Sequence, residues 1–242
     1  MELIELVNPN GNGCYNLKRQ NYFIFKCFFS DFSEEEIEII RKDTKILEEK
    51  ADYHAANSGE HRTFIIKHLD SFTGIIAEVI TQKMFKEHFN IKAERPEVKT
   101  TENQIDILLN LFPKQYTVEV RSSMVRNGIS FALFNGYKGT PYFDVIGPYC
   151  QSNYKKAFES LKDIYIRVLF DVNSFNTPDA KYQGIKDSKL PFYIIGGIQG
   201  KTLKQANKTK SMTTEVVENP GTYYYLGIDE ILDCKRLKEI LK

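Results

Sequence analysis

Two acidic residues and an arginine in neighbouring predicted strands are the residues of this chain best suited to catalysis. The segment Thr100–Ser123, TTENQIDILLNLFPKQYTVEVRSS, contains Asp106 and, thirteen residues later, Glu119, which Arg121 follows closely. Apolar residues alternate on both sides of a Pro-Lys-Gln break, which predicts two antiparallel strands. Both acids fall on the parity opposite to the apolar residues, so pairing brings their carboxylates together. Two neighbouring carboxylates repel each other and favour a bound cation.

The elements around this hairpin predict an α/β protein with a mixed central β-sheet flanked by helices. A capping box of Ser33 and Glu36 begins a helix that runs to about residue 53. Asp70 or Ser71 is expected to cap a second helix, whose apolar residues recur from Phe72 onward. Residues 1–32 read as a small hairpin or an addition to a sheet edge. Further strands are expected over 91–95, 129–134, 164–170, 191–197 and 222–227, and helices over 152–161 and 229–241.

Glu78 lies within the second predicted helix, beside its apolar face. For the helix alone, a surface glutamate is the simpler interpretation, because acidic residues on helices are mostly solvated. The position gains interest only because the helix comes immediately before the acidic hairpin.

Composition sets bounds on the class of protein. The chain has 242 residues, 42% hydrophobic and 27% charged, which is typical of a soluble globular protein with no membrane span. Four scattered cysteines without CxxC spacing, and no secretory signal at the start, predict a reducing, cytoplasmic setting. The net charge of +1 excludes a globally basic nucleic-acid binder, so a DNA-binding face has to come from local clustering. We expect an N-terminal extension over 1–65, a hairpin plus a helix packed on the core, and a main domain over 66–242.

Together these residues resemble the PD-(D/E)XK nuclease superfamily, which has a restriction-endonuclease-like fold. That family joins a glutamate on the first core helix, an aspartate opening one strand and an ExK on the partner strand. The matching positions are Glu78, Asp106, Glu119 and, in place of the lysine, Arg121. Ile105 stands where the family name has proline. The resemblance covers Phe72 to Phe170 and implies a restriction-endonuclease-like core with N-terminal and C-terminal additions.

The resemblance also implies a reaction and a cofactor. Asp106, Glu119 and the backbone carbonyl of Val120 would bind Mg²⁺, for which Mn²⁺ can substitute, and Glu78 would bind through water or hold a second ion. The implied activity is Mg²⁺-dependent hydrolysis of phosphodiester bonds in double-stranded DNA. A type II restriction endonuclease, which often acts as a homodimer, is the most concrete version.

Arg121 is the departure that leaves alternatives open. A guanidinium cannot act as a base, although it can hold the scissile phosphate bidentately. One alternative is therefore a catalytically weak or inactive nuclease-fold protein that binds DNA or serves in assembly. Another is an ion pair of Arg121 with Glu119 or Asp106 and no metal, as part of a structural protein. Lys83 is a candidate to replace the missing lysine.

Polar and basic residues beyond the motif are suited to DNA phosphates. Those just after the second strand and in the next Gly-rich turn are Ser122, Ser123, Arg126, Asn127 and Lys138. The most concentrated positive stretch contains Lys201, Lys204, Lys208 and Lys210. Its alternative interpretation is a solvated loop or helix, as charged stretches usually are.

Overall fold

A mixed sheet of eight strands forms the centre of the computed structural model, which describes residues 1–8, 21–50, 62–96, 105–137, 140–141, 143–151, 159–211 and 222–242. The strands follow the order β1-β2-β10-β9-β5-β4-β3, and β13 pairs with β10. Their bounds are β1 Glu2–Val7, β2 Asn21–Cys27, β3 Lys92–Glu94, β4 Ile107–Leu111, β5 Lys114–Val125, β9 Ile164–Asp171, β10 Phe192–Gln199 and β13 Leu232–Asp233. Only β5 and β9 pair in parallel among these strands.

A small antiparallel sheet accompanies the large one. It contains β8 (Asp144–Gln151), β12 (Thr222–Gly227) and β11 (Thr209–Ser211), in the order β11-β12-β8. A two-stranded ribbon, β6 (Gly136–Tyr137) and β7 (Thr140–Pro141), lies apart from both sheets. The predicted α/β class with a mixed central sheet is confirmed.

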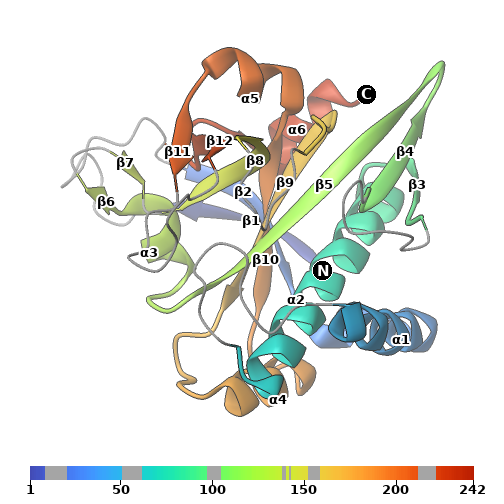
Figure 1. Cartoon of the computed structure of the whole chain (residues 1–242), viewed down its shortest axis with the longest axis vertical. Helices are drawn as coiled ribbons and strands as arrows, with labels where there is room; N and C mark the ends of the chain where they lie inside the picture. The colour runs from blue at the N-terminus through green and yellow to red at the C-terminus, as the bar shows by residue number, and fades with distance from the viewer. Residues whose placement is uncertain are drawn as a thin grey trace.

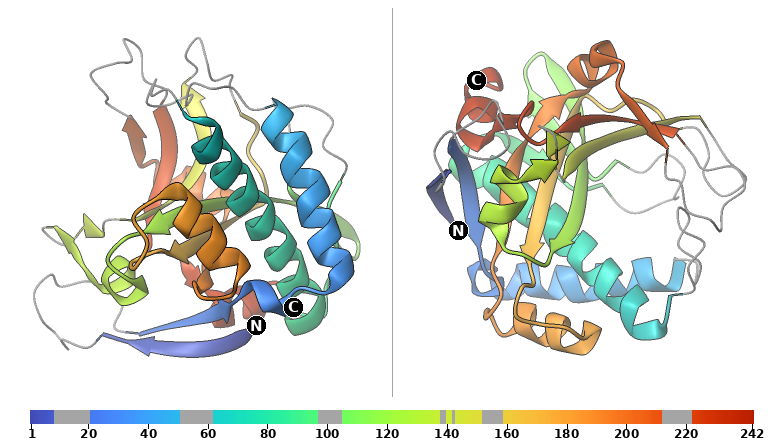
Figure 2. Two further views of the ribbon diagram at one scale, coloured as in Figure 1. Left: turned by 90° about the horizontal axis from the view of Figure 1, so that it is seen from below. Right: turned by 90° about the vertical axis from the view of Figure 1, so that its left-hand side faces the viewer.

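Helices and the small sheet cover opposite faces of the large sheet (Figure 1). Helices α1 (Glu34–Lys50), α2 (Phe64–Lys83) and α4 (Pro178–Lys186) form a layer on one face (Figure 2), and α6 (Cys234–Ile240) contributes to the same core. Helices α3 (Ile129–Phe134) and α5 (Gly200–Ala206) pack with the small sheet into a second core. Two short turns, Phe29–Asp31 and Met84–His88, complete the helical elements of the described ranges.

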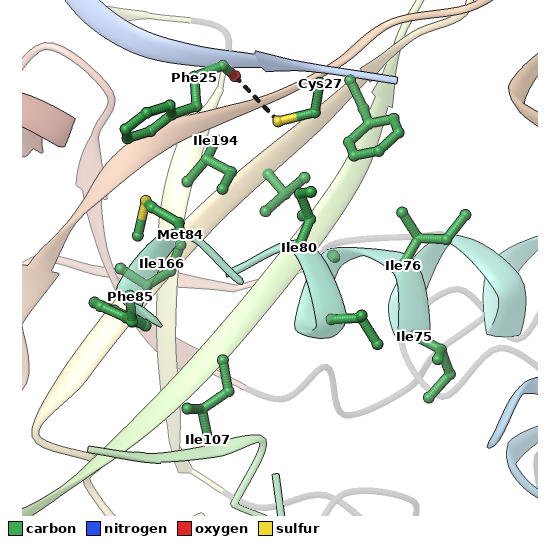
Figure 3. Close-up of a cluster of buried hydrophobic side chains, with 14 of the residues drawn as sticks. Phe25, Cys27, Ile75, Ile76, Ile80, Met84, Phe85, Ile107, Ile166 and Ile194 are labelled. Carbon is green, nitrogen blue, oxygen red and sulfur yellow. Dashed lines mark hydrogen bonds between the residues drawn. The ribbon is translucent and has the colours of Figure 1, made fainter. Parts of the chain in front are cut away.

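Strand β9 shows why the sheet has two cores. All of its residues from Ile164 to Phe170 are buried, because both faces of the strand are covered. Ile166 packs with Ile76, Ile80 and Met84 of the helical layer (Figure 3), and the alternate residues of β9 belong to the same core. Tyr165 and Leu169 belong to the second core. Each large apolar side chain buried in this way contributes about 1.5–3 kcal/mol.

The N-terminal part of the chain joins the main sheet. β1 and β2 form the expected hairpin, and β2 pairs with β10. Helix α1 begins as predicted, since Ser33 and Glu36 exchange capping hydrogen bonds of 2.8 and 3.2 Å. It packs on α2 and so extends the helical layer. The predicted stretch beyond residue 50 lies outside the described residues.

Helix α2 begins earlier than predicted. Its N-cap is Thr63, whose hydroxyl accepts from the backbone N–H of Ile66, so Asp70 and Ser71 lie inside the helix and do not cap it. The buried position Leu69 continues the apolar face toward the N-terminus, one turn before Phe72. The prediction failed because a cap-type residue inside a long apolar pattern resembles a true helix start.

Two other element predictions were wrong. Residues 129–134 form helix α3, which buries Ile129, Ala132 and Leu133 at helical spacing; a mainly apolar run of six residues is too short to show its period. The C-terminal helix begins only at Cys234, because Leu232 pairs with β10 and Asp233 caps the helix. Residues 159–161 are not helical, and the rest of the predicted helix at 152–161 lies outside the described residues. Within the described ranges, no helix is long and apolar enough to cross a membrane.

Candidate catalytic site

The β4–β5 hairpin places Asp106 beside Glu119, as the residue pattern predicts. Ile107 pairs with Val118, so Asp106 stands opposite Glu119 at the point where β4 begins. The backbone N–H of Asp106 donates to the carbonyl of Val118 (3.2 Å), and its Oδ2 accepts from the N–H of Val120 (2.7 Å). These two bonds fix the orientation of the Asp106 carboxylate.

Burial and two neighbouring carboxylates disfavour the ionised form of Asp106. Its exposed fraction is 9%, and burial raises its pKa well above the ordinary value. The negative charges of Glu119 and Glu78 raise the pKa further, and the Val120 N–H and Arg121 only partly oppose them. Three carboxylates from α2, β5 and the start of β4 therefore act on one another.

Glu78 is buried, with 8% of its surface exposed, so its interpretation as a surface residue is wrong. Its Oε2 accepts from Nη2 (2.7 Å) and Nε (3.2 Å) of Arg95, which follows β3. The same guanidinium donates through Nη1 to Asp43 of α1 (3.0 Å). Burial raises the pKa of Glu78 and Arg95 lowers it, with burial the larger effect. One arginine is thus shared by two carboxylates.

Arg121 is held in the same way on β5. Its Nη2 lies 3.0 Å from Oε1 of Glu119 and 3.1 Å from Oε2 of Glu159. Glu159 also accepts from the backbone N–H of Tyr149 (3.3 Å). Burial lowers the pKa of Arg121, but the surrounding carboxylates raise it more, so the guanidinium stays charged. The ion pair with Glu119 that was one alternative for Arg121 is present.

Arg167 of β9 completes the cluster. The parallel register pairs it with Arg121, so both side chains lie on one face of the sheet. Its Nη2 donates to Oγ of Ser123 at 2.9 Å. Burial and the charge of Arg121 lower the pKa of Arg167 to about 10, although Asp144 raises it.

The donor chemistry of the site suits Mg²⁺. Its carboxylates outnumber its guanidinium groups: Arg95 is shared by two acids and Arg121 by two more, while no arginine of the described residues lies within ion-pair distance of Asp106. Mg²⁺ commonly takes one or two carboxylates and completes its shell with water and phosphate oxygens, which Asp106 and Glu119 can match. In the described part of the chain, no three His, Cys, Asp or Glu side chains are grouped closely enough to hold a metal ion. A bound ion would therefore rest on this pair, and Glu78 stays with Arg95.

The other predicted residues near the motif are dispersed. Ser122 and Val120 are partly buried on β5, and Arg126 and Asn127 are exposed just beyond its end. Lys138 lies outside the described residues. Lys83 is held by Glu36 (3.1 Å) and Glu87 (2.8 Å), so the structure gives no support to its role as a substitute for the lysine of the motif.

The four lysines of the predicted basic stretch separate into two pairs. Lys201 and Lys204 are exposed on α5. Lys208 binds Glu230 (2.7 Å) and Lys210 binds Asp144 (2.9 Å), so the second pair is already neutralised. Asp144 also acts on Arg167, which links the small sheet electrostatically to the candidate site.

Sequence reasoning missed Arg95, Glu159 and Arg167. Arg167 had a readable signal, because it is the one charged residue inside the apolar run IYIRVLF. Arg95 and Glu159 had none, since their partners lie far away in sequence.

A comparison of the chain with known protein families, curated proteins and solved structures found no match.

Proposed function

We propose that this chain is a Mg²⁺-dependent DNA endonuclease of the PD-(D/E)XK type, with a type II restriction enzyme as the most concrete version. The observation that carries the proposal is the convergence of Asp106, Glu119 and Glu78, which are buried or partly buried and act on one another electrostatically. Acids of this kind are costly for stability and cluster where function requires them.

The order of elements supports the same proposal. Helix α2 precedes three consecutive antiparallel strands, β3, β4 and β5, and the chain then crosses over to β9, which lies parallel to β5. The order expected for a restriction-endonuclease-like core is a helix, three strands, a helix and a strand; here α3, β6, β7 and β8 lie between β5 and β9. The glutamate, aspartate and ExR positions fall on α2, at the start of β4 and on β5.

In the proposed mechanism, Asp106, Glu119 and the carbonyl of Val120 would hold Mg²⁺, which when bound polarises a phosphate and lowers the pKa of a water ligand. The Val120 N–H keeps Asp106 oriented toward Glu119. Arg95 holds Glu78 in place, close enough to add negative charge to the site. Each of these residues binds or orients, and none needs to move far.

Arg121 would hold and stabilise the phosphate without accepting a proton. Its pKa is raised, so it stays a cation at every physiological pH. Its Nε has no hydrogen-bond partner in the described part of the chain, which leaves one donor for a phosphate oxygen. Interactions of this type supply about 3–4 kcal/mol of transition-state stabilisation in other enzymes.

A second candidate function is DNA binding by a nuclease-fold protein with weak or no cleavage. The observation that favours it is the engagement of Arg121 by both Glu119 and Glu159. A cation satisfied by two carboxylates is poorly placed to serve a substrate. Turnover distinguishes the two candidates, because both would bind double-stranded DNA.

The test is incubation of the purified protein with diverse duplex DNA in Mg²⁺ or Mn²⁺, beside EDTA and an Asp106→Asn variant purified identically. Discrete fragments that disappear in both controls support a site-specific endonuclease. Cleavage that persists in the variant would come from a contaminant and would count against the proposal. DNA binding without fragments would favour the second candidate. Size-exclusion chromatography of the protein in the presence of DNA would show whether a homodimer forms.

A further inference from the structure

Arg167 is a buried cation in the middle of the central strand β9. It is 4% exposed, and its neighbours Ile166 and Val168 are fully buried. Transfer of a guanidinium from water into such a place is costly unless an anion accompanies it. The structure should therefore show how the charge is balanced.

The described residues do not balance it. Arg167 makes one hydrogen bond, to the neutral hydroxyl of Ser123, and its Nε has no partner in the described ranges. Asp144 acts on it only at longer range and is itself bound by Lys210 at 2.9 Å. Each of the other two arginines of the site, by contrast, contacts two carboxylates.

A second cation lies directly beside Arg167. Arg121 is its partner in the parallel register, and the two guanidinium groups repel each other, which contributes to the lowered pKa of Arg167. The side chain of Arg121 is 24% exposed, so this member of the pair reaches solvent. The two guanidinium groups and the Ser123 hydroxyl together place several hydrogen-bond donors beside the acidic residues of the hairpin.

We infer that Arg167 and Ser123 form the inner half of a phosphate-binding subsite, with Arg121 on its solvent side. The Ser123 oxygen accepts from Arg167, so its O–H is free to rotate and donate to a phosphate oxygen. The Nε–H of Arg167 supplies a second donor. Under the proposed function, on which this inference rests for its substrate, the ligand is a phosphodiester of DNA held beside the carboxylates.

A purely structural role for Arg167 makes a different prediction. If Arg167 serves mainly as a counter-charge for Asp144, its removal destabilises the fold and leaves anion binding unchanged. If Arg167 instead binds an anionic ligand, its replacement by an apolar residue of similar length stabilises the ligand-free protein, because an uncompensated buried charge is removed. The two roles therefore predict changes in stability of opposite sign when Arg167 is replaced.

The experiment is thermal unfolding of the metal-free, full-length protein in inorganic phosphate, compared with chloride at equal ionic strength. Wild-type protein should gain about 5–10 °C in Tm when phosphate reaches a hundred times its Kd. Arg167→Met should have a higher Tm than wild type in chloride and lose the phosphate gain. Arg41→Met is the matched control: it removes an arginine that forms an exposed ion pair with Glu38 on α1, and it should keep the gain.

A phosphate gain that survives in Arg167→Met, or that is lost equally in Arg41→Met, would overturn the inference. If Arg167→Met does not fold, Ser123→Ala tests the inference in its place. This variant should weaken phosphate binding about tenfold, whereas a purely structural role of Arg167 predicts no change. This assay does not use cleavage. A phosphate response in a protein that never cuts DNA would support the subsite and contradict the nuclease proposal. Cleavage without a phosphate response would support the nuclease proposal and contradict the subsite.

Discussion

The carboxylate of Asp106 accepts a 2.7 Å hydrogen bond from the backbone N–H of Val120, the residue that follows Glu119 on the neighbouring strand. This bond holds two repelling acids together at the buried end of a hairpin. It also separates two properties of Asp106, since an asparagine side chain can accept the same bond while it carries no charge.

Asp106→Asn should therefore stabilise the metal-free protein and abolish cleavage. Removal of a buried charge next to Glu119 should raise the free energy of unfolding at neutral pH by on the order of 1 kcal/mol, since one unit of pKa elevation corresponds to about 1.4 kcal/mol. Cleavage should fall at least a hundredfold with the loss of a metal ligand. Urea unfolding in EDTA and a cleavage assay in Mg²⁺ measure the two effects.

Asp163→Asn is the control, at a carboxylate that lies just before β9 and binds strand β5 of the same hairpin. Asp163 accepts from Lys114 and from Thr117, and these bonds lower its pKa despite burial. Its charged form stabilises the fold, so this substitution should be destabilising, opposite in sign to Asp106→Asn. A stabilising effect in both variants, or in neither, would contradict the account of Asp106.

The raised pKa of Asp106 also sets a pH dependence. In the window between the ordinary carboxyl pKa and the raised one, the folded state binds more protons than the unfolded state, so stability falls as pH rises. Mg²⁺ should displace the proton, and its affinity should rise with pH until Asp106 is fully ionised. Calorimetric titration of Mg²⁺ at several pH values checks this, and an affinity independent of pH would show that Asp106 is not a ligand.

The sequence predicted the acidic hairpin well because strand periodicity and local turn chemistry determine it. Ile107 and Val118 pair as their alternation requires, and the parity of Asp106 and Glu119 follows from that register. Strands β9 and β10 were equally readable, because long β-branched runs have few other stable conformations.

The surroundings of the acids were not readable in the same way. Arg95 meets Glu78 across 17 positions of sequence and Asp43 across 52, and Arg121 meets Glu159 across 38. Such pairs depend on how α1, α2 and the sheet pack, which no local pattern encodes. Helix α3 was misassigned for a related reason, since its buried face is created by the second core.

Arg95→Met should be among the most destabilising substitutions in the chain. It leaves Glu78 and Asp43 without their shared cation, and breaking a buried pair in this way costs about 3–5 kcal/mol. The control is Arg41→Met, which breaks an exposed pair with Glu38 and should change stability by less than about 1 kcal/mol. Denaturant unfolding compares the two. Equal effects would show that the Glu78 site is open to solvent.

Arg121→Gln should strengthen Mg²⁺ binding and weaken catalysis. The guanidinium neutralises Glu119, so it competes with a metal for the same carboxylate, and its removal should lower the Kd for Mg²⁺ several-fold. The rate of DNA cleavage should fall about 10²–10³-fold if Arg121 stabilises the phosphate. Arg41→Gln, at an exposed position of α1, should change neither quantity. Faster cleavage in Arg121→Gln would mean that Arg121 is an inhibitor of the site.

The lysines of α5 and those of the segment from Lys208 into β11 should differ in how they contribute to DNA binding. Lys201 and Lys204 are exposed, so replacing either by alanine should reduce the slope of log Kd against log salt by about 0.9 if it contacts a phosphate. Lys208 and Lys210 are bound to Glu230 and Asp144, and a carboxylate released by their removal offsets part of the change. Fluorescence anisotropy with a labelled duplex over a range of salt concentrations measures each slope. An effect of Lys208→Ala as large as that of Lys201→Ala would show that DNA displaces Glu230 from its lysine.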